Sequence, residues 1–332
     1  MKKVDMIVDL QYGSTGKGLI AGYLGVERRY DVVVNANMPN AGHTYVDQYG
    51  QTMIHKVLPS GICGTDLVCV LLGAGSVFSL EQLQKELVHL WSLNYMKGIP
   101  IYIHPNAVIL QPHHAREEAG MDNIGSTKQG AGAALVEKIR RDPSMSSNLL
   151  ARSHYSRIAE ATQGAAQVID HHQYHNVLKS AGRILAEGAQ GYSLGLNQKF
   201  WPYCTSRECT PARFMSDMGI PLNYLNEVIG TCRVHPIRVG GTSGPHYPDQ
   251  TEISFDSIGQ VEELTTVTKK VRRLFTWSNM QMYDAVFECA PDHIFLNFCN
   301  YDPVRASKIQ QEFDEVKWCG FGPRHVDVME ML

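Results

Sequence analysis

A short apolar run at residues 4–8 breaks into a glycine-rich turn, Gly13-Ser14-Thr15-Gly16-Lys17-Gly18, which contains one lysine. A strand that ends in such a turn and continues as a helix presents backbone amides and a cation to a phosphate group. The first glycine and the Gly-Lys pair lie too close together for a Walker A loop. The turn therefore predicts a short, unusual phosphate site, although an ordinary strand–helix connection with a surface lysine would look the same.

The rest of the chain alternates β-rich runs with amphipathic helical stretches. We expect strands over residues 4–10, 30–37, 67–72, 101–103, 183–187, 226–239 and 293–297. We expect helices over residues 17–24, 80–92, 131–141, 148–175, 210–218, part of 257–273, 280–289 and 303–312. This alternation predicts an α/β fold with a large, mainly parallel central sheet flanked by helices. We expect a single domain over residues 1–332, with a helical insertion around 110–180 that can form a subdomain.

Composition excludes several classes of protein. The chain has 332 residues, of which 44% are hydrophobic and 19% charged, and its formal net charge is -3. No global positive field would draw it to nucleic acid or to a membrane surface, and the longest apolar runs are too short to span a bilayer. The N-terminus enters a strand almost at once, which leaves no room for a signal peptide. Eight irregularly spaced cysteines predict free thiols in the cytoplasm.

Further loops carry polar groups that suit small anionic ligands. His43 follows a glycine at the end of the second β run, where open α/β sheets bind ligands, although a histidine there can equally well satisfy a turn. The segments 123–132 and 203–206 are rich in hydroxyl groups, and the cluster at 269–273 is basic. A basic cluster is usually a solvated face, but it can also bind carboxylates. We interpret His113-His114 and the His171/His175 pair as solvated helix faces, because no third metal ligand can be placed.

Eight loops in one order resemble the adenylosuccinate synthetase family over nearly the whole chain. They are residues 13–18, 40–44, 58–61, 124–127, 187–191, 238–240, 267–273 and 320–323. The resemblance implies an adenylosuccinate synthetase-like fold and a Mg²⁺-dependent ligase that acts as a homodimer. Members join L-aspartate to the 6-position of inosinate with GTP, through a 6-phosphoryl intermediate.

The resemblance also assigns site residues. Catalytic roles fall to His43, Ser14 and Gln190, and the metal ligands are Ser14 and the Gly42 carbonyl. Arg141 matches an arginine that reaches across the dimer interface to the 5′-phosphate. The nucleotide phosphates of the donor are bound by Gly13, Ser14, Thr15, Gly16, Lys17, Gly18, Gly42, His43 and Thr44. The acceptor nucleotide is bound by Ser14, Asn40, Ser126, Thr127, Arg141, Gln190, Thr205, Val239 and Lys270. Aspartate is bound by Thr266, Val267, Thr268 and Arg272, and the donor base by Asn300, Asp302, Gly320, Gly322 and Pro323.

Three departures from the family pattern bear on the substrate. Ser14 stands where the family has an aspartate that acts as the base for the ring proton and binds the metal. A serine hydroxyl is far too weakly acidic to replace that base, but its small size can leave room for a 2-amino group. Asn300 stands where the family has a guanine-reading lysine, which argues against GTP and for ATP or dATP, whereas the retained Asp302 still favours a guanine base. Lys270 replaces an arginine near the ribose.

These departures resemble a phage branch of the family, whose members condense dGMP with aspartate to give N6-succino-2-amino-2′-deoxyadenylate. We therefore expect a ligase that uses dGMP, L-aspartate and ATP or dATP. Host lyase-type and nucleotide kinase enzymes would convert its product to a 2,6-diaminopurine nucleotide, which replaces adenine in phage DNA and protects it from restriction. The alternatives are an ordinary adenylosuccinate synthetase acting on IMP with GTP, or a non-catalytic nucleotide sensor.

Overall fold

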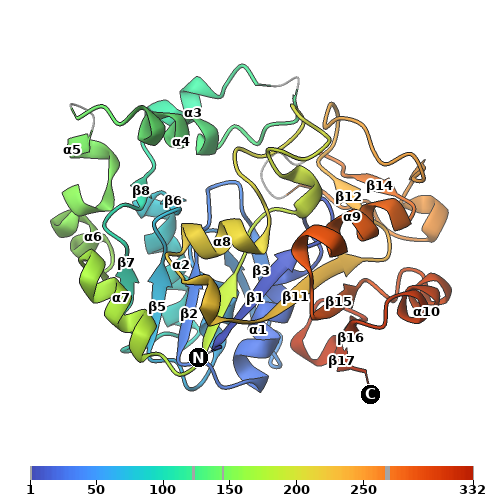
Figure 1. Cartoon of the computed structure of the whole chain (residues 1–332), viewed down its shortest axis with the longest axis horizontal. Helices are drawn as coiled ribbons and strands as arrows, with labels where there is room; N and C mark the ends of the chain where they lie inside the picture. The colour runs from blue at the N-terminus through green and yellow to red at the C-terminus, as the bar shows by residue number, and fades with distance from the viewer. Residues whose placement is uncertain (1, 122–123, 144–145, 266–269, 332) are drawn as a thin grey trace.

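A ten-stranded sheet crosses the molecule in the computed structural model, which describes residues 2–121, 124–143, 146–265 and 270–331 (Figure 1). The strand order is β17-β16-β15-β11-β1-β10-β2-β5-β7-β9, and only β16 and β17 pair antiparallel. The strands are β1 (Val4–Asp9), β2 (Val32–Asn35), β5 (Cys69–Leu72), β7 (Ile101–Ile103), β9 (Ala166–Val168), β10 (Ile184–Glu187), β11 (Leu225–Arg233), β15 (His293–Asn297), β16 (Val316–Gly320) and β17 (Val328–Glu330). The predicted α/β fold class is confirmed.

Helices cover both faces of this sheet. One apolar cluster joins alternate residues of β1 to the helices α7 to α10, and a second joins the other face to α1, α2 and α6. Both layers are needed because the central parallel strands are buried on two sides. The helices are α1 (Lys17–Glu27), α2 (Leu80–Ser92), α3 (Pro112–Glu117), α4 (Ala131–Arg140), α5 (Ser146–Leu149), α6 (Tyr155–Ala161), α7 (His171–Ser180), α8 (Pro211–Asp217), α9 (Asn279–Cys289) and α10 (Pro303–Glu312).

Three small sheets lie outside the main one. Strand β3 (His43–Val46) forms a hairpin with β4 (Thr52–His55), and β6 (Val77–Phe78) pairs with β8 (Val108–Ile109). The third sheet contains β12 (Ile237–Arg238), β13 (Glu252–Ile253) and β14 (Arg273–Phe275). None of the helices among the described residues is long and apolar enough to cross a membrane.

Three predicted elements were wrong. The helix predicted over 148–175 is divided into α5, α6, β9 and α7, because Gly164 turns the chain with a φ of +82° and Asp170 caps a new helix. The strand predicted over 226–239 is divided into β11, which ends at Arg233, and β12, since Pro236 between them cannot donate to a ladder. The described part of 257–273 contains no α-helix and ends in β14. Because β9 pairs with β7 in the main sheet, the stretch 110–180 is not purely helical. The predicted single domain over residues 1–332 stays a prediction.

The sheet brings polar residues to one edge. The five neighbouring strands β15, β11, β1, β10 and β2 end in Asn297, Arg233, Asp9, Glu187 and Asn35. Since these strands are parallel, all five side chains lie at the same edge of the sheet, toward the top of Figure 1. Ligands of open α/β sheets bind at this edge.

Candidate active site

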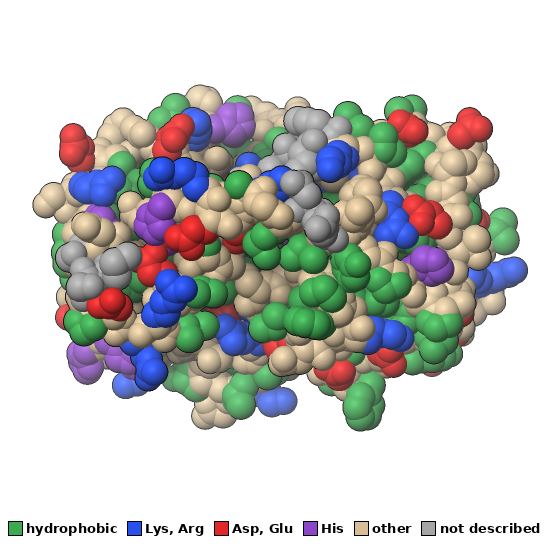
Figure 2. Space-filling view, turned by 90° about the horizontal axis from the view of Figure 1, so that it is seen from above, with side chains coloured by type: hydrophobic (Ala, Val, Ile, Leu, Met, Phe, Trp, Pro, Cys, Tyr) green, Lys and Arg blue, Asp and Glu red, His purple; other side chains and the backbone are tan. Residues whose placement is uncertain are grey.

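A cavity of about 670 Å³ opens at this edge of the sheet and brings most of the predicted site residues together. Figure 2 looks onto the molecule from above and shows lysine and arginine side chains interspersed with apolar and polar ones, without one continuous basic patch. The predicted residues that line the cavity are Gly13, Ser14, Thr15, Gly16, Lys17, Gly18, Asn40, Gly42, His43, Thr44, Ser126, Thr127, Gln190, Thr205, Val239, Arg272, Asn300, Gly322 and Pro323.

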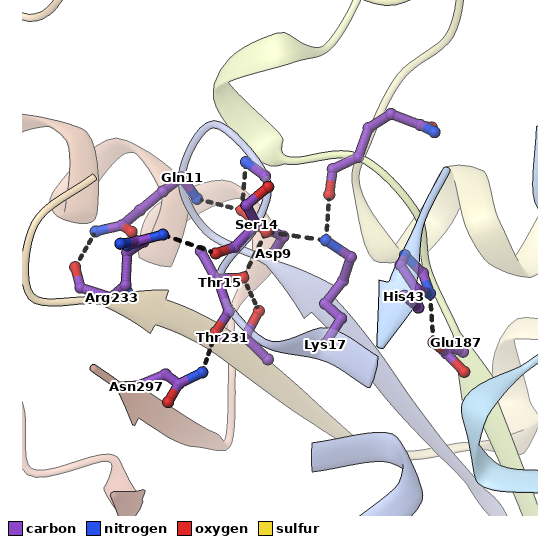
Figure 3. A network of polar contacts seen from close by, with 12 residues as sticks. Asp9, Gln11, Ser14, Thr15, Lys17, His43, Glu187, Thr231, Arg233 and Asn297 are labelled. Atoms are coloured by element: carbon purple, nitrogen blue, oxygen red, sulfur yellow. Dashed lines mark hydrogen bonds and ion pairs between the residues drawn. The ribbon is translucent and has the colours of Figure 1, made fainter. Parts of the chain in front are cut away.

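The glycine-rich turn joins β1 to α1 and is folded around the carboxylate of Asp9. Oδ1 of Asp9 accepts hydrogen bonds from the amides of Gln11 (2.9 Å) and Gly13 (3.1 Å). Oδ2 accepts from Oγ1 of Thr15 (2.5 Å) and from Nζ of Lys17 (2.9 Å), as Figure 3 shows. Asp9 and Lys17 are only 1% and 4% exposed, so this ion pair is shielded from water and from screening by salt.

Two glycines of the turn, Gly16 and Gly18, are required by close approach of neighbouring chain segments. Gly16 has a φ of +93°, and a Cβ there would lie 2.1 Å from Nδ2 of Asn297. A Cβ on Gly18 would lie 2.8 Å from the backbone of Thr44. These contacts pack the turn directly against the end of β15 on one side and against the start of β3 on the other.

His43 is held by a buried glutamate. Its Nδ1 lies 2.5 Å from Oε1 of Glu187, and Oε2 of Glu187 accepts the amide of Ser60 at 2.5 Å. Glu187 is 1% exposed. With Nδ1 held by a carboxylate, the other ring nitrogen, Nε2, is left to serve a ligand. His55 pairs opposite His43 in the β3–β4 hairpin, and burial lowers the pKa of His55 to about 4, so it is neutral beside the Glu187–His43 pair.

Three predicted acceptor-site residues form a hydrogen-bonded chain. Nε2 of Gln190 donates to Oδ1 of Asn40 (3.0 Å), and Nδ2 of Asn40 donates to Oγ1 of Thr205 (3.3 Å). Gln190 has a φ of +59°, a conformation that non-glycine residues rarely adopt. Its carbonyl accepts from Nζ of Lys17 (2.7 Å), and its Oε1 accepts from the buried Arg207 (3.3 Å). Lys17 therefore links the glycine-rich turn to the part of the cavity wall that contains Asn40, Gln190 and Thr205.

The opposite wall is organised by Arg233, whose side chain is fully buried. Nη2 of Arg233 lies 2.6 Å from Oε1 of Glu263, and Nη1 donates to the carbonyl of Ser14 at 3.4 Å. Its guanidinium stacks on the ring of Phe298, 3.7 Å from the centroid. Burial would raise the pKa of Glu263, but Arg233, Arg272 and the Tyr301 hydroxyl together outweigh this and lower it. Glu263 is thus a carboxylate held by a cation.

Several predicted site residues lie outside the cavity lining. Arg141 is exposed and ends α4 in a left-handed conformation, Lys270 is exposed, and Gly320 ends β16. Asp302 caps α10 by accepting the amide of Arg305 at 2.9 Å. The roles predicted for these four residues stay predictions. Thr266, Val267 and Thr268 lie outside the described residues.

One histidine pair was misinterpreted. His114 is fully buried, and both His113 and His114 contact Oε2 of Glu137, at 2.8 and 2.6 Å. Nδ1 of His114 accepts the amide of Gln111 at 3.1 Å, so its Nε2 must carry the proton that bonds Glu137. A metal ion would need that nitrogen deprotonated. The cluster is therefore a clamp between α3 and α4 rather than the solvated face that we predicted.

The sequence reasoning missed four residues that organise the site: Asp9, Glu187, Arg233 and Glu263. Asp9 and Glu187 share a signal, since each is a charged residue at or next to the carboxyl end of an expected strand in an apolar run. A buried charge at that position is costly unless it has a partner or a function. Arg233 lies inside the strand expected over 226–239, and its place at a strand end became visible only because β11 ends there. Glu263 offered no such signal, because it lies in a segment without clear periodicity.

Comparisons with known proteins agree with this geometry. The adenylosuccinate synthetase family model matches residues 6–175 and 152–297. The chain is 53% identical to the N6-succino-2-amino-2′-deoxyadenylate synthase of Vibrio phage phiVC8, over 99% of this chain and 98% of that protein. It is 32% identical to the adenylosuccinate synthetase of Thermoplasma acidophilum, over 84% of this chain and 71% of that protein.

Two solved structures share the fold. The succinoaminodeoxyadenylate synthetase of cyanophage S-2L, bound to dGMP and to dATP as an energy donor, superposes with a TM-score of 0.91 at 38% identity, covering 99% of this chain and 95% of that one. A fully ligated adenylosuccinate synthetase from Plasmodium falciparum superposes with a TM-score of 0.80 at 19% identity, covering 99% and 100%. At this identity, the second likeness concerns the fold alone.

Proposed function

The chain belongs to the adenylosuccinate synthetase family, and on this premise we propose that it ligates L-aspartate to the 6-position of dGMP at the expense of ATP or dATP. The observation that carries the proposal is Ser14, which stands in the phosphate turn where the family has an aspartate, beside an acceptor wall built from Asn40, Gln190 and Thr205. The cyanophage relative, which binds dGMP and dATP, supports the same substrates.

The reaction has two steps. The 6-oxygen of dGMP attacks the terminal phosphorus of the donor while N1 loses its proton to solvent water, and the donor leaves as a diphosphate. The amine of aspartate then adds to C6, and the phosphate departs with the former 6-oxygen. Lys17 and His43 line the cavity beside the turn, where a cation and a ring N–H can stabilise the charge that develops on the transferred phosphoryl group. Arg272, also in the lining, can bind a carboxylate of aspartate.

The preference for one acceptor nucleotide follows from the small size of Ser14 and from its lack of charge. Ser14 is exposed to the cavity in a left-handed conformation with a φ of +58°. A serine at this position leaves more space than an aspartate and places no carboxylate against the purine edge, so a 2-amino group can be accommodated. We propose that Ser14 selects guanine over hypoxanthine. The predicted homodimer, with Arg141 acting across the interface, belongs to the same proposal.

The donor preference follows from Asp302 and Asn300. Oδ1 of Asp302 already accepts the Arg305 amide, and Oδ2 lies 3.8 Å from Nε2 of His235. A carboxylate used as a helix cap is less available to read the N1 and N2 donors of guanine. Asn300 lines the cavity and can both donate and accept. This pair of residues suits an adenine donor better than GTP.

A Mg²⁺ ion is part of the proposal because hard oxygen ligands are present in the cavity. The Gly42 carbonyl and the Ser14 hydroxyl would hold it, and both residues line the cavity. When bound, the ion would neutralise charge on the donor phosphates. Among the described residues, the carboxylates that line the cavity are Glu118, which is held by backbone amides, and Glu263, which is held by Arg233. The Gly42 carbonyl and the Ser14 hydroxyl are neutral ligands, and they fit an ion that is bound mainly through the phosphates of the nucleotide.

The test is a comparison of acceptors. Purified protein with L-aspartate, Mg²⁺ and ATP or dATP is given dGMP, GMP or IMP, and the succinylated product is identified by mass. We expect turnover of dGMP in preference to IMP. Turnover of IMP alone would identify an ordinary adenylosuccinate synthetase. In that case Ser14→Asp should raise activity on IMP, whereas under our proposal it should reduce activity on dGMP.

A further inference from the structure

The glycine-rich turn at residues 13–18 is folded around the carboxylate of Asp9, a residue to which no role has been assigned above. We propose that Asp9 is a positioning residue for the ligation. It holds the turn and the ammonium of Lys17 in the arrangement that directs the terminal phosphate of the donor toward the 6-oxygen of the acceptor. The inference rests on the proposed function, because it assumes phosphoryl transfer between two nucleotides in this cavity.

The hydrogen bonds of Asp9 assign it to positioning rather than to proton abstraction. A carboxylate has about four acceptor sites. The amides of Gln11 and Gly13 occupy Oδ1, while Thr15 and Lys17 occupy Oδ2. Asp9 is also absent from the cavity lining and only 1% exposed. A carboxylate with all its acceptor sites engaged, beneath the turn, cannot receive the ring proton of the acceptor.

Lys17 carries the effect of Asp9 into the cavity. Its ammonium has three N–H groups. Oδ2 of Asp9 takes one at 2.9 Å and the carbonyl of Gln190 takes another at 2.7 Å. The third can point at a phosphoryl oxygen, because Lys17 lines the cavity. Asp9, beneath the turn that faces the donor nucleotide, and Gln190, in the wall that faces the acceptor nucleotide, thus together fix the direction of this third N–H.

Asp9 is the carboxylate that holds the turn. Ser14 is uncharged, and within the described ranges Asp9 alone supplies a carboxylate that bonds residues 13–17. Thr15 adds a second link, because its Oγ1 also lies 2.5 Å from Oγ1 of Thr231 on β11. The charge of Asp9 therefore anchors the turn to two adjacent strands, β1 and β11.

The experiment compares Asp9→Asn with a matched control, Asp5→Asn. Asp5 lies on the same strand, is fully buried, and accepts from Tyr30 (2.6 Å), Asn226 (2.8 Å) and Arg183 (2.9 Å), away from the cavity. For both variants one measures the unfolding midpoint in urea, kcat, and the dissociation constant of a non-hydrolysable ATP analogue. Because a 1 Å misplacement can reduce a rate by about 100-fold, we expect Asp9→Asn to lower kcat by about 100-fold.

Comparison of kcat with the dissociation constant of the ATP analogue separates a positioning role of Asp9 from a simple loss of structure. Without the carboxylate, Lys17 is less neutralised, so the analogue should bind as tightly as before or more tightly while kcat falls. Asp5→Asn should lower the urea midpoint and leave kcat per folded molecule unchanged. The proposal is wrong if kcat of Asp9→Asn matches wild type, or if it falls only with the folded fraction.

Two further arms keep the test decisive. If Asp9→Asn does not fold, Thr15→Val removes one donor from the Asp9 carboxylate and keeps its charge. It should then lower kcat by about tenfold, in line with the loss of one hydrogen bond, and an unchanged kcat would refute the proposal. If the wild-type protein uses IMP instead of dGMP, the same comparison is made with IMP. In that outcome the acceptor assignment fails while the role of Asp9 is still tested.

Discussion

Replacing Glu187 by glutamine should disable His43 without unfolding the protein. Glu187 has two partners, Nδ1 of His43 and the Ser60 amide, each at 2.5 Å. In the Glu187→Gln variant, the amide oxygen can keep the Ser60 bond, and the NH₂ group must then donate to Nδ1. His43 can still present an N–H from Nε2, but no carboxylate compensates the positive ring that would stabilise the transferred phosphoryl group.

The size of the effect follows from the interactions that are lost. A hydrogen bond to a charged group contributes about 1.5–3 kcal/mol, and a neutral one about 1 kcal/mol. Loss of one preorganised charge-stabilising donor costs about 10²–10³ in kcat in other enzymes. We expect kcat to fall about 100-fold, equivalent to about 2.7 kcal/mol. The free energy of unfolding should change by no more than about 1 kcal/mol, because both hydrogen-bond partners are retained.

The assay is steady-state phosphate release with dGMP, L-aspartate and dATP, together with urea unfolding. Glu86→Gln is the matched control, because Glu86 is also a buried glutamate, and it accepts the amides of Lys56 (2.8 Å) and Leu58 (3.0 Å) on the segment before Ser60. That variant should lose stability and keep kcat. Our reasoning about His43 is refuted if Glu187→Gln retains wild-type kcat, or if Glu86→Gln lowers kcat as much as Glu187→Gln does.

Two other predictions concern pH and metal. Burial lowers the pKa of His55 and of His104 from 6.5 to about 4. As the pH decreases, these histidines therefore bind protons in the unfolded chain before they do so in the folded protein. The free energy of unfolding should fall as the pH decreases from 6.5 to about 4. Urea titrations across this range should show a weaker pH dependence for His104→Gln, and a stability that rises on acidification would contradict the argument. Chelation of Mg²⁺ should abolish turnover and leave the urea midpoint unchanged, because Gly42 and Ser14 would offer the ion only neutral ligands; a large fall in the midpoint would instead indicate a structural metal.

Much of the fold was predictable because strand and helix periodicities agree with the tertiary packing. The expected strand at 293–297 and the helices at 80–92 and 303–312 coincide with β15, α2 and α10. The failures occurred where local signals were weak. The hairpin of β3 and β4 is short and half exposed. The stretch 148–175 has a helical composition that only Gly164 and the Asp170 cap interrupt.

The site was predictable where residues carry ligand-facing motifs, and less so where they support other residues. The roles of Ser14, His43 and Gln190 were assigned from the resemblance of their loops to one family, and the cavity brings the three residues together. Asp9 bonds residues of the adjoining turn. Glu187 and Arg233 instead act through hydrogen bonds to residues distant in sequence, and His43 lies 144 positions before Glu187. No periodicity records such pairings, so they become visible only once the sheet places the strand ends side by side.

The most direct test of the account follows the 6-oxygen of the acceptor. The protein is given dGMP labelled with ¹⁸O at position 6, L-aspartate, Mg²⁺ and dATP, and the released phosphate and the nucleotide product are analysed by mass spectrometry. Our account predicts that the label appears in phosphate, one atom for each succinylated nucleotide formed. Label that stays in the nucleotide, or phosphate released without label, would contradict ligation through a 6-phosphoryl intermediate.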